Sequence, residues 1–198
     1  MIFKVTLLFP LAYLVGSVPW GLILTRIFSD TDIRAAGSGN IGASNVFRLT
    51  GKTLGLLTLG GDLLKGAIPV LAGTLWIGTS DWRGQVLVSL VALSAFAGHL
   101  FPVFLRFKGG KGVATAAGCF LVISPLSFLV CLLVYVLMVC WWGYSSVGSL
   151  SAAAILPLAV WLATGSVPAT VCALTMAVMI FVRHADNIKR LLEGTENP

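Results

Sequence analysis

Residues 113–142 read VATAAGCFLVISPLSFLVCLLVYVLMVCWW, a stretch without one charged side chain. A helix that crosses a bilayer needs about 20 predominantly apolar residues, because each residue rises 1.5 Å and the hydrocarbon core is about 30 Å thick. The run is long enough to lie in a membrane, and it indicates an integral membrane protein. Ser124 and Pro125 interrupt it. Because proline breaks or kinks a helix, the run forms either one bent helix or two short ones.

The rest of the chain has the same character. Hydrophobic residues make up 58% of the sequence and charged residues 10%, whereas soluble domains carry about 25% charged residues. The first apolar run, 2–28, is too long for a removable signal peptide, so we expect it to remain as a span. Residues 1–198 are predicted to form a single membrane-embedded domain. The remaining apolar runs are 53–75, 85–105, 147–164 and 166–182.

The positions of the charges decide between six and seven spans. With two helices in 113–142, the C-terminal tail joins the polar loops on one side, and only Lys4 and Arg83 lie on the other. Cytoplasmic segments carry the excess of Lys and Arg, so we predict an all-α integral membrane protein of about seven transmembrane helices, some short, with the N-terminus outside and the C-terminus cytoplasmic. Segment 113–123 would be only ~16 Å long, so we expect it to line a dip in the cytoplasmic face. The predicted cytoplasmic cations are Arg26, Arg34, Arg48, Lys52, Arg106, Lys108, Lys111, Arg183, Lys189 and Arg190.

The longest polar stretch contains GSGNIGASNVFR at residues 37–48. It fits G-x-G-x-x-G, but a dinucleotide site needs a preceding strand, and an apolar run precedes this one. Glycines let backbone N–H groups converge on a phosphate, and Ser38, Asn40 and Asn45 add neutral donors. The guanidinium of Arg48 matches phosphate or carboxylate oxygens. The composition alone supports equally a phosphate site and a glycine-rich connector beside lipid headgroups.

Two further polar stretches carry cations. RFKGGKG at 106–112 lacks the first glycine and the Ser/Thr of a nucleotide-binding P-loop, yet a flexible cationic turn at a helix start attracts anions. RHADNIKR at 183–190 places His184 and Asn187 on one helix face, with Arg183 beside them. The alternatives are a topological anchor for the first stretch and a headgroup-binding tail for the second.

Other polar and sulfur-containing residues lie within the apolar runs. Asp62 and Lys65 are functional candidates because ionisable groups are costly in a membrane, but we favour an internal ion pair that supports neighbouring helices. The sequence has no G-x-S-x-G or H-E-x-x-H motif, so neither an acyl-enzyme serine nor a zinc centre is supported. Four cysteines lack metal-ligand spacing and are expected to pack, at Cys119, Cys131, Cys140 and Cys172.

The three polar stretches together resemble the bacterial acyl-phosphate:glycerol-3-phosphate acyltransferase family, the PlsY type, over nearly the whole chain. Ser44 stands where many relatives carry Thr, which keeps the hydroxyl. The resemblance rests on residues 37–48, on GHLFP at 98–102 with KGGKGVAT at 108–115, and on RHADNIKRL at 183–191, with GSVPWG at 16–21 and DLLKG at 62–66 in agreement.

The resemblance implies a seven-helix acyltransferase that catalyses the first step of phospholipid synthesis. Such enzymes move a fatty acyl group from acyl phosphate to the 1-hydroxyl of sn-glycerol 3-phosphate, giving lysophosphatidic acid and phosphate. They use no metal, no cofactor and no acyl-CoA. Carried over by motif, the catalytic residues are Ser38 for a phosphate, Arg48 and Lys111 for glycerol phosphate or the departing phosphate, and His184 and Asn187 for the acceptor. The expected substrate-binding residues are Gly37, Gly39, Asn40, Gly42, Asn45, Lys108, Gly109, Gly110, Gly112 and Arg183.

This chemistry agrees with the residues. An acyl phosphate is already activated, so the protein needs positioning and charge stabilisation more than a covalent nucleophile, and we expect direct transfer without an acyl-enzyme. The base is either His184 or a substrate phosphate oxygen, and the sequence does not choose between them. Expected partners are acyl phosphate, glycerol 3-phosphate, the lipid bilayer and the enzyme that makes acyl phosphate, with no nucleic acid. The expected location is the bacterial cytoplasmic membrane.

A small membrane carrier for phosphate or an organic phosphate is the alternative function. It would also need cationic loops, glycines and several spans. Against it, the sequence has no internal repeat, and its anion-binding residues lie at one face rather than at the midplane. A structural lipid-binding scaffold, the third interpretation, leaves the residues from Ser38 to Arg48 unexplained.

Overall fold

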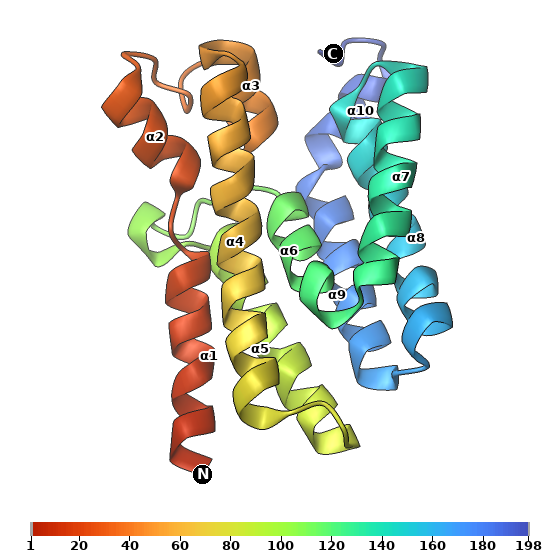
Figure 1. The fold of residues 1–198 in the computed structure, drawn as a ribbon. Helices are drawn as coiled ribbons and strands as arrows, with labels where there is room; N and C mark the ends of the chain where they lie inside the picture. The colour runs from red at the N-terminus through yellow and green to blue at the C-terminus, as the bar shows by residue number, and fades with distance from the viewer. Residues whose placement is uncertain (1, 198) are drawn as a thin grey trace.

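The computed structural model describes residues 2–197, with side chains from Thr6 onward, and these residues form helices without strands. Figure 1 shows the bundle. The predicted outside cation Lys4 therefore has no described side chain. The elements are α1 Ile2–Gly16, α2 Trp20–Phe28, α3 Ala43–Thr50, α4 Lys52–Ile77, α5 Trp82–Leu100, the 3-10 helix η1 Val103–Leu105, α6 Val113–Ile123, α7 Pro125–Trp142, α8 Ser145–Thr164, α9 Val167–Arg183 and α10 Ala185–Leu192.

The apolar run 113–142 divides into two helices, α6 and α7. The break lies at Ser124, and Pro125 begins α7. The first residue of a helix has no acceptor for its N–H within the helix, so a proline there costs no hydrogen bond. The Ser124 and Ser127 hydroxyls are hydrogen-bonded at 2.7 Å across the break. Two helices rather than one bent helix therefore occupy 113–142, and α6 has 11 residues.

Within the described residues, five helical segments are long and apolar enough to cross a membrane, or six if α9 and α10, bent by 56°, count as one span. This confirms the integral membrane prediction. The two termini lie at opposite ends of the bundle, and α3 and α10 lie at the end that carries the C-terminus (Figure 1). The short α6 begins closer to the middle of the bundle than α3, as a helix lining a dip should. The total of seven spans and the side that faces the cytoplasm stay predictions.

Close backbone contact joins α4 to α6 beneath the polar loops. A side chain at Gly66 of α4 would collide with the carbonyl of Thr115, and one at Gly118 of α6 would collide with the carbonyl of Leu63. In lipid, helices associate through such small residues because the solvent is as apolar as the side chains. This contact fixes α6, and with it the loop that precedes α6.

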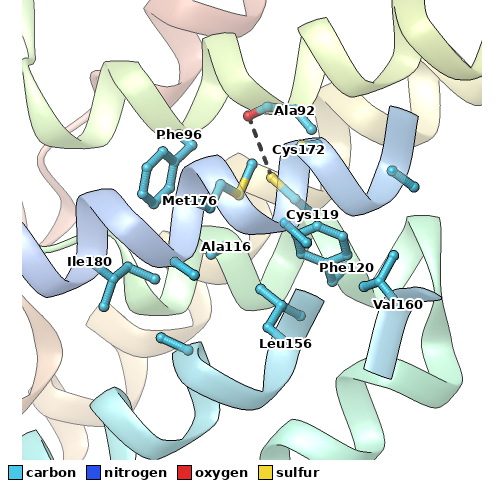
Figure 2. Close-up of a cluster of buried hydrophobic side chains, with 14 of the residues drawn as sticks. Ala92, Phe96, Ala116, Cys119, Phe120, Leu156, Val160, Cys172, Met176 and Ile180 are labelled. Carbon is cyan, nitrogen blue, oxygen red and sulfur yellow. Dashed lines mark hydrogen bonds between the residues drawn. The ribbon is translucent and has the colours of Figure 1, made fainter. Parts of the chain in front are cut away.

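The apolar core lies between α5, α6, α8 and α9 (Figure 2). Phe96, Phe120 and Met176 fill it, and the thiol of Cys119 donates to the carbonyl of Ala92 at 3.8 Å. The packing prediction is confirmed for the two buried cysteines and for Cys131, which packs against this core, whereas Cys140 is exposed because α7 turns most of its surface away from the bundle. Cys119 and Cys172 are buried, Cys131 is half-buried and Cys140 is exposed.

Candidate active site

A cavity of about 450 Å³ opens between the polar loops and the middle of the bundle. Most of its polar lining comes from the loops, from α3 and α10 and from the C-terminal tail, and its apolar lining from further along the long helices, so the cavity has a polar end and an apolar end. This suits a ligand with an anionic head and a hydrocarbon chain. The polar end is lined by Gly37, Ser38, Asn40, Gly42, Ser44, Asn45, Arg48, Lys111, Gly112, His184, Asn187, Arg190, Glu196 and Asn197, and the apolar end includes Leu59, Leu63, Phe120, Phe128, Leu132, Leu156 and Ile180.

The first glycine loop, residues 37–42, is held by Asn45 of α3. The Asn45 Oδ1 atom accepts the Ser38 N–H at 3.0 Å, and its Nδ2 donates to the carbonyls of Ile33 and Asn40, both at 2.9 Å. The side chain of Asn40 accepts the N–H of Gly42 at 2.9 Å. Asn45 is buried, so this network is formed away from solvent.

This network changes the expected role of the first glycine loop. The N–H groups of Ser38, Gly39 and Gly42 donate to the side chain of Asn45, the carbonyl of Ala36 and the side chain of Asn40, so these three donors are occupied by protein acceptors. Asn45 likewise holds the backbone instead of presenting its amide to a ligand. Gly39 does not line the cavity, although Gly37 and Asn40 do. The exposed hydroxyl of Ser38 remains as a donor at the cavity.

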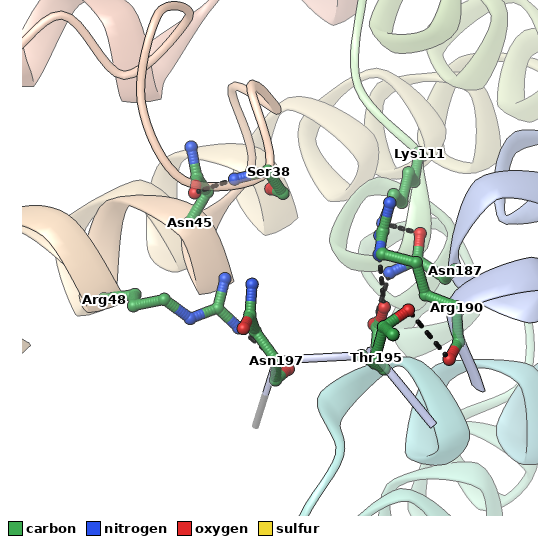
Figure 3. Close-up of polar contacts among 9 residues, drawn as sticks. Ser38, Asn45, Arg48, Lys111, Asn187, Arg190, Thr195 and Asn197 are labelled. Carbon is green, nitrogen blue, oxygen red and sulfur yellow. Dashed lines mark hydrogen bonds and ion pairs between the residues drawn. The ribbon is translucent and has the colours of Figure 1, made fainter. Parts of the chain in front are cut away.

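Cationic side chains face one another across the cavity (Figure 3). Arg48 of α3 lies on one side, and its Nη2 donates to the carbonyl of Asn197 at 3.3 Å. On the other side, the Nζ of Lys111 donates to the Oδ1 of Asn187 in α10. Burial lowers the pKa of Lys111 to about 8, and the carboxylate of Glu196 opposes that shift.

The C-terminal tail served in the sequence analysis to decide the number of spans. In the structure it also contacts Asn187 and Arg190 beside Lys111. Glu196 accepts from Asn187 Nδ2 at 2.6 Å and pairs with the Nε of Arg190 at 2.7 Å. Burial would raise the pKa of Glu196, but the hydrogen bonds from Asn187 and Arg190 outweigh it and lower the pKa. No local pattern announces this contact, because it requires the chain to reverse after α10 through Gly194 at φ +67°.

His184 lies in the turn between α9 and α10 and is buried. Its Nδ1 is 2.8 Å from the carbonyl of Ile180, so Nδ1 carries the proton and Nε2 is a free acceptor. Burial, reinforced by the charge of Lys111, lowers the pKa of His184 to about 4. The ring is therefore neutral near pH 7 and can accept a hydrogen bond at the cavity.

A buried ion pair lies below the polar end. Asp62 and Lys65 are 2.7 Å apart, and Lys65 also donates to the carbonyl of Val18 at 2.9 Å. The predicted internal ion pair is confirmed. Asp62 and His99 line the cavity as well, a position that the sequence analysis did not give them. The signal for His99 was its place in GHLFP at 98–102, shortly before the cationic stretch 106–112.

Four of the predicted binding residues, in the cationic stretch 106–112 or in contact with it, do not line the cavity: Lys108, Gly109, Gly110 and Arg183. Lys108 is exposed, and the guanidinium of Arg183 donates to the carbonyls of Gly109 and Gly110, at 2.7 and 3.1 Å. The spacing of residues in the sequence could not predict that Arg183 binds these two carbonyls, because every residue has a backbone carbonyl. Across residues 2–197, no group of three or more His, Cys, Asp or Glu side chains is placed to hold a metal ion.

Comparison with known proteins identifies the relatives of this chain. Residues 6–194 match the family model described as glycerol-3-phosphate acyltransferase. Glycerol-3-phosphate acyltransferases of Syntrophotalea carbinolica and Geobacter sulfurreducens are 50% and 51% identical to it, over 94% of this chain and 93% of each relative.

Solved structures agree. The crystal structure of PlsY, an integral membrane glycerol 3-phosphate acyltransferase, in its glycerol 3-phosphate form superposes with a TM-score of 0.92 at 37% identity, covering 98% of this chain and 94% of that one. Its lysophosphatidic acid form gives a TM-score of 0.90 at 36% identity, with the same coverage.

Proposed function

This chain belongs to the glycerol-3-phosphate acyltransferase family, and from that premise we propose that it transfers a fatty acyl group from acyl phosphate to the 1-hydroxyl of sn-glycerol 3-phosphate. The products are lysophosphatidic acid and phosphate. The observation that carries the proposal is the two-ended cavity, in which the cations Arg48 and Lys111 lie at the polar end and helices α4, α6, α7, α8 and α9 line the apolar end. Such a cavity suits two phosphates and an acyl chain together.

The bond changes follow from the acyl phosphate itself. The acceptor hydroxyl oxygen bonds to the carbonyl carbon, the bond from that carbon to the phosphate oxygen breaks, and phosphate leaves with the bonding pair. Negative charge grows on the carbonyl oxygen and the leaving group, so Lys111, Arg48 and the Ser38 hydroxyl stabilise the transition state by electrostatics and hydrogen bonding. No step uses a covalent bond to the protein.

The hydroxyl proton needs an acceptor. A phosphate monoester loses its second proton near pH 6, so its dianion is a stronger base than a histidine with a pKa of about 4. We therefore assign the proton to a substrate phosphate oxygen and give His184 Nε2 the task of orienting the hydroxyl. Asn187, whose Oδ1 accepts from Lys111, orients the ammonium.

The cellular setting is part of the proposal. The protein would act in the cytoplasmic membrane of a bacterium, with its polar loops inside the cell, and receive acyl phosphate from the enzyme that makes it. Apolar side chains on the outer surface agree with a lipid environment: Leu75, Trp141 and Leu162 are 73%, 81% and 75% exposed.

The test uses purified full-length protein in detergent or vesicles, with palmitoyl phosphate and glycerol 3-phosphate. Lysophosphatidic acid and phosphate should appear in equal amounts. Palmitoyl-CoA at the same concentration should give little or no product, because the cavity residues already serve two phosphates and no further cationic stretch would hold adenosine diphosphate. Uptake of glycerol 3-phosphate into vesicles without acyl transfer would instead make the protein a carrier and overturn the proposal.

A further inference from the structure

The second glycine loop, residues 109–112, folds back along the end of α5. The N–H of Gly109 donates to the carbonyl of Leu100 at 3.2 Å, and the N–H of Gly110 donates to the carbonyl of His99 at 3.1 Å. A side chain at Gly110 would collide with the His99 ring, and one at Gly109 with the two carbonyls. On its α5 side, the loop therefore touches a surface that leaves no room for a Cβ atom.

That surface is itself fixed. The Nδ1 of His99 lies 3.0 Å from the hydroxyl of Thr115, and this hydroxyl donates to the carbonyl of Asp62, also at 3.0 Å. The Thr115 oxygen is thus the acceptor and His99 Nδ1 the donor. Because Thr115 belongs to α6 and Asp62 to α4, three helices determine where the His99 ring lies beneath Gly110.

Arg183 holds the other edge of the loop. Its Nη2 donates to the carbonyl of Gly109 at 2.7 Å, and its Nε donates to the carbonyl of Gly110 at 3.1 Å. Its guanidinium also lies over the ring of Phe101, 6.0 Å from the centroid. One planar group with two donors fixes two successive carbonyls, which a lysine ammonium, with its donors on one nitrogen, cannot match.

Lys111 directly follows Gly110 in the chain. We propose that Arg183 is a positioning residue, which presses the Gly109–Gly110 backbone against His99 and thereby sets the point from which Lys111 reaches the cavity. The inference rests on the proposed function, because it assigns Lys111 to a substrate phosphate. It replaces the expectation that Arg183 binds phosphate directly.

A double-mutant cycle tests whether Arg183 acts through Lys111. Arg183→Ala should lower kcat/KM about ten-fold or more in the wild type, but no more than about two-fold in a Lys111→Ala background, since the two residues serve one interaction. Arg183→Lys should recover only part of the loss. Arg26→Ala is the matched control: Arg26 is also in the last turn of a helix, α2, but is exposed and does not line the cavity, and kcat/KM should not change.

Hydrogen exchange on substrate-free protein tests the clamp independently of the reaction. Arg183→Ala and Arg183→Lys should speed exchange at the Gly109 and Gly110 amides and leave the core helices protected. If Arg183→Ala folds poorly, the Arg183→Lys measurement decides. Unchanged exchange at these amides, or equal losses of activity with and without Lys111, would overturn the proposal and return Arg183 to direct phosphate contact. Failure of the wild type to make lysophosphatidic acid would refute the proposed function and leave the exchange result standing.

Discussion

The two glycine loops of the cavity are held by different means. Asn45 holds the first, and every backbone partner of its side chain lies within 12 residues along the chain. The second also has local bonds, from its N–H groups to the carbonyls of His99 and Leu100, but its own carbonyls accept from Arg183, which is 73 residues from Gly110 and 74 from Gly109. The first loop can therefore take its shape as soon as α3 packs beside it. The contacts of the second loop are complete only when α9 has reached α5, which makes the position of Lys111 a property of the assembled bundle.

The largest effect should follow removal of the Lys111 ammonium, which the second loop positions at the cavity. We expect Lys111→Ala to lower kcat/KM about a hundred-fold, roughly 2.7 kcal/mol of transition-state stabilisation. Arg48→Ala should cost at least about ten-fold, and Arg48→Lys should recover it only in part because an ammonium lacks the planar fork. Lys108→Ala, an exposed neighbour in the same segment, is the control and should stay near wild type. Equal activity of the Lys111 and Lys108 variants would reduce Lys111 to an anchor.

The first loop should respond to loss of its local support. Asn45→Ala removes the bonds to Ser38, Ile33 and Asn40, so kcat/KM should fall about ten-fold and exchange should speed up at the Ser38 amide. The second loop should keep its protection, because none of its contacts involve Asn45. Thr50→Ala, later in α3, serves as the control. Faster exchange in both loops at once would contradict the conclusion that the two loops are held independently.

The donor of the first loop should have a smaller effect. Ser38→Ala should lower kcat/KM for palmitoyl phosphate several-fold to ten-fold, since one hydrogen bond to a charged oxygen is lost. Mass spectrometry during turnover should find no acyl group on Ser38. An acylated Ser38 would mean that the first loop supplies a nucleophile, and direct transfer would have to be abandoned.

The second loop should also confer a pH dependence. Because the pKa of Lys111 is lowered to about 8, its ammonium is present below that pH and is lost above it. The kcat/KM of the free enzyme should be about half-maximal at pH 8 and about ten-fold lower at pH 9. Lys111→Arg should remove this alkaline limb, since guanidinium stays charged. Rates are corrected for the spontaneous hydrolysis of palmitoyl phosphate at each pH. The same limb in Lys111→Arg would assign the titration to another group.

The last prediction concerns topology and should leave activity unchanged. Both loops and the C-terminal tail should share the cytoplasmic side. Single cysteines at Lys52, Lys108 and Glu193, in a background without the native four, should react alike with a membrane-impermeant thiol reagent. A cysteine at Arg83 should behave in the opposite way. Labelling of Glu193 from the side of Arg83 would contradict an odd number of spans.

The sequence by itself determined the membrane class, the division of 113–142 at Ser124 and Pro125, and the stretches that carry phosphate chemistry. Hydrophobic runs and proline act within one helix length, and the distribution of Lys and Arg decides between one helix and two, so these effects can be predicted without a fold. The sequence also placed Ser38, Arg48, Lys111, His184 and Asn187 as candidates, and the structure gathers these five around one cavity.

Only the tertiary structure decided what each polar group faces. Asn45 turns to the loop backbone, Arg183 turns to the carbonyls of Gly109 and Gly110, and Glu196 enters the cavity after the chain reverses. Sequence reasoning assigned donors by residue type, but a buried donor takes whichever acceptor the fold brings to it, and every residue offers a carbonyl. The choice between phosphate and backbone was therefore made by the packing of α3 against the first glycine loop for Asn45, and by the approach of α9 to the second glycine loop for Arg183.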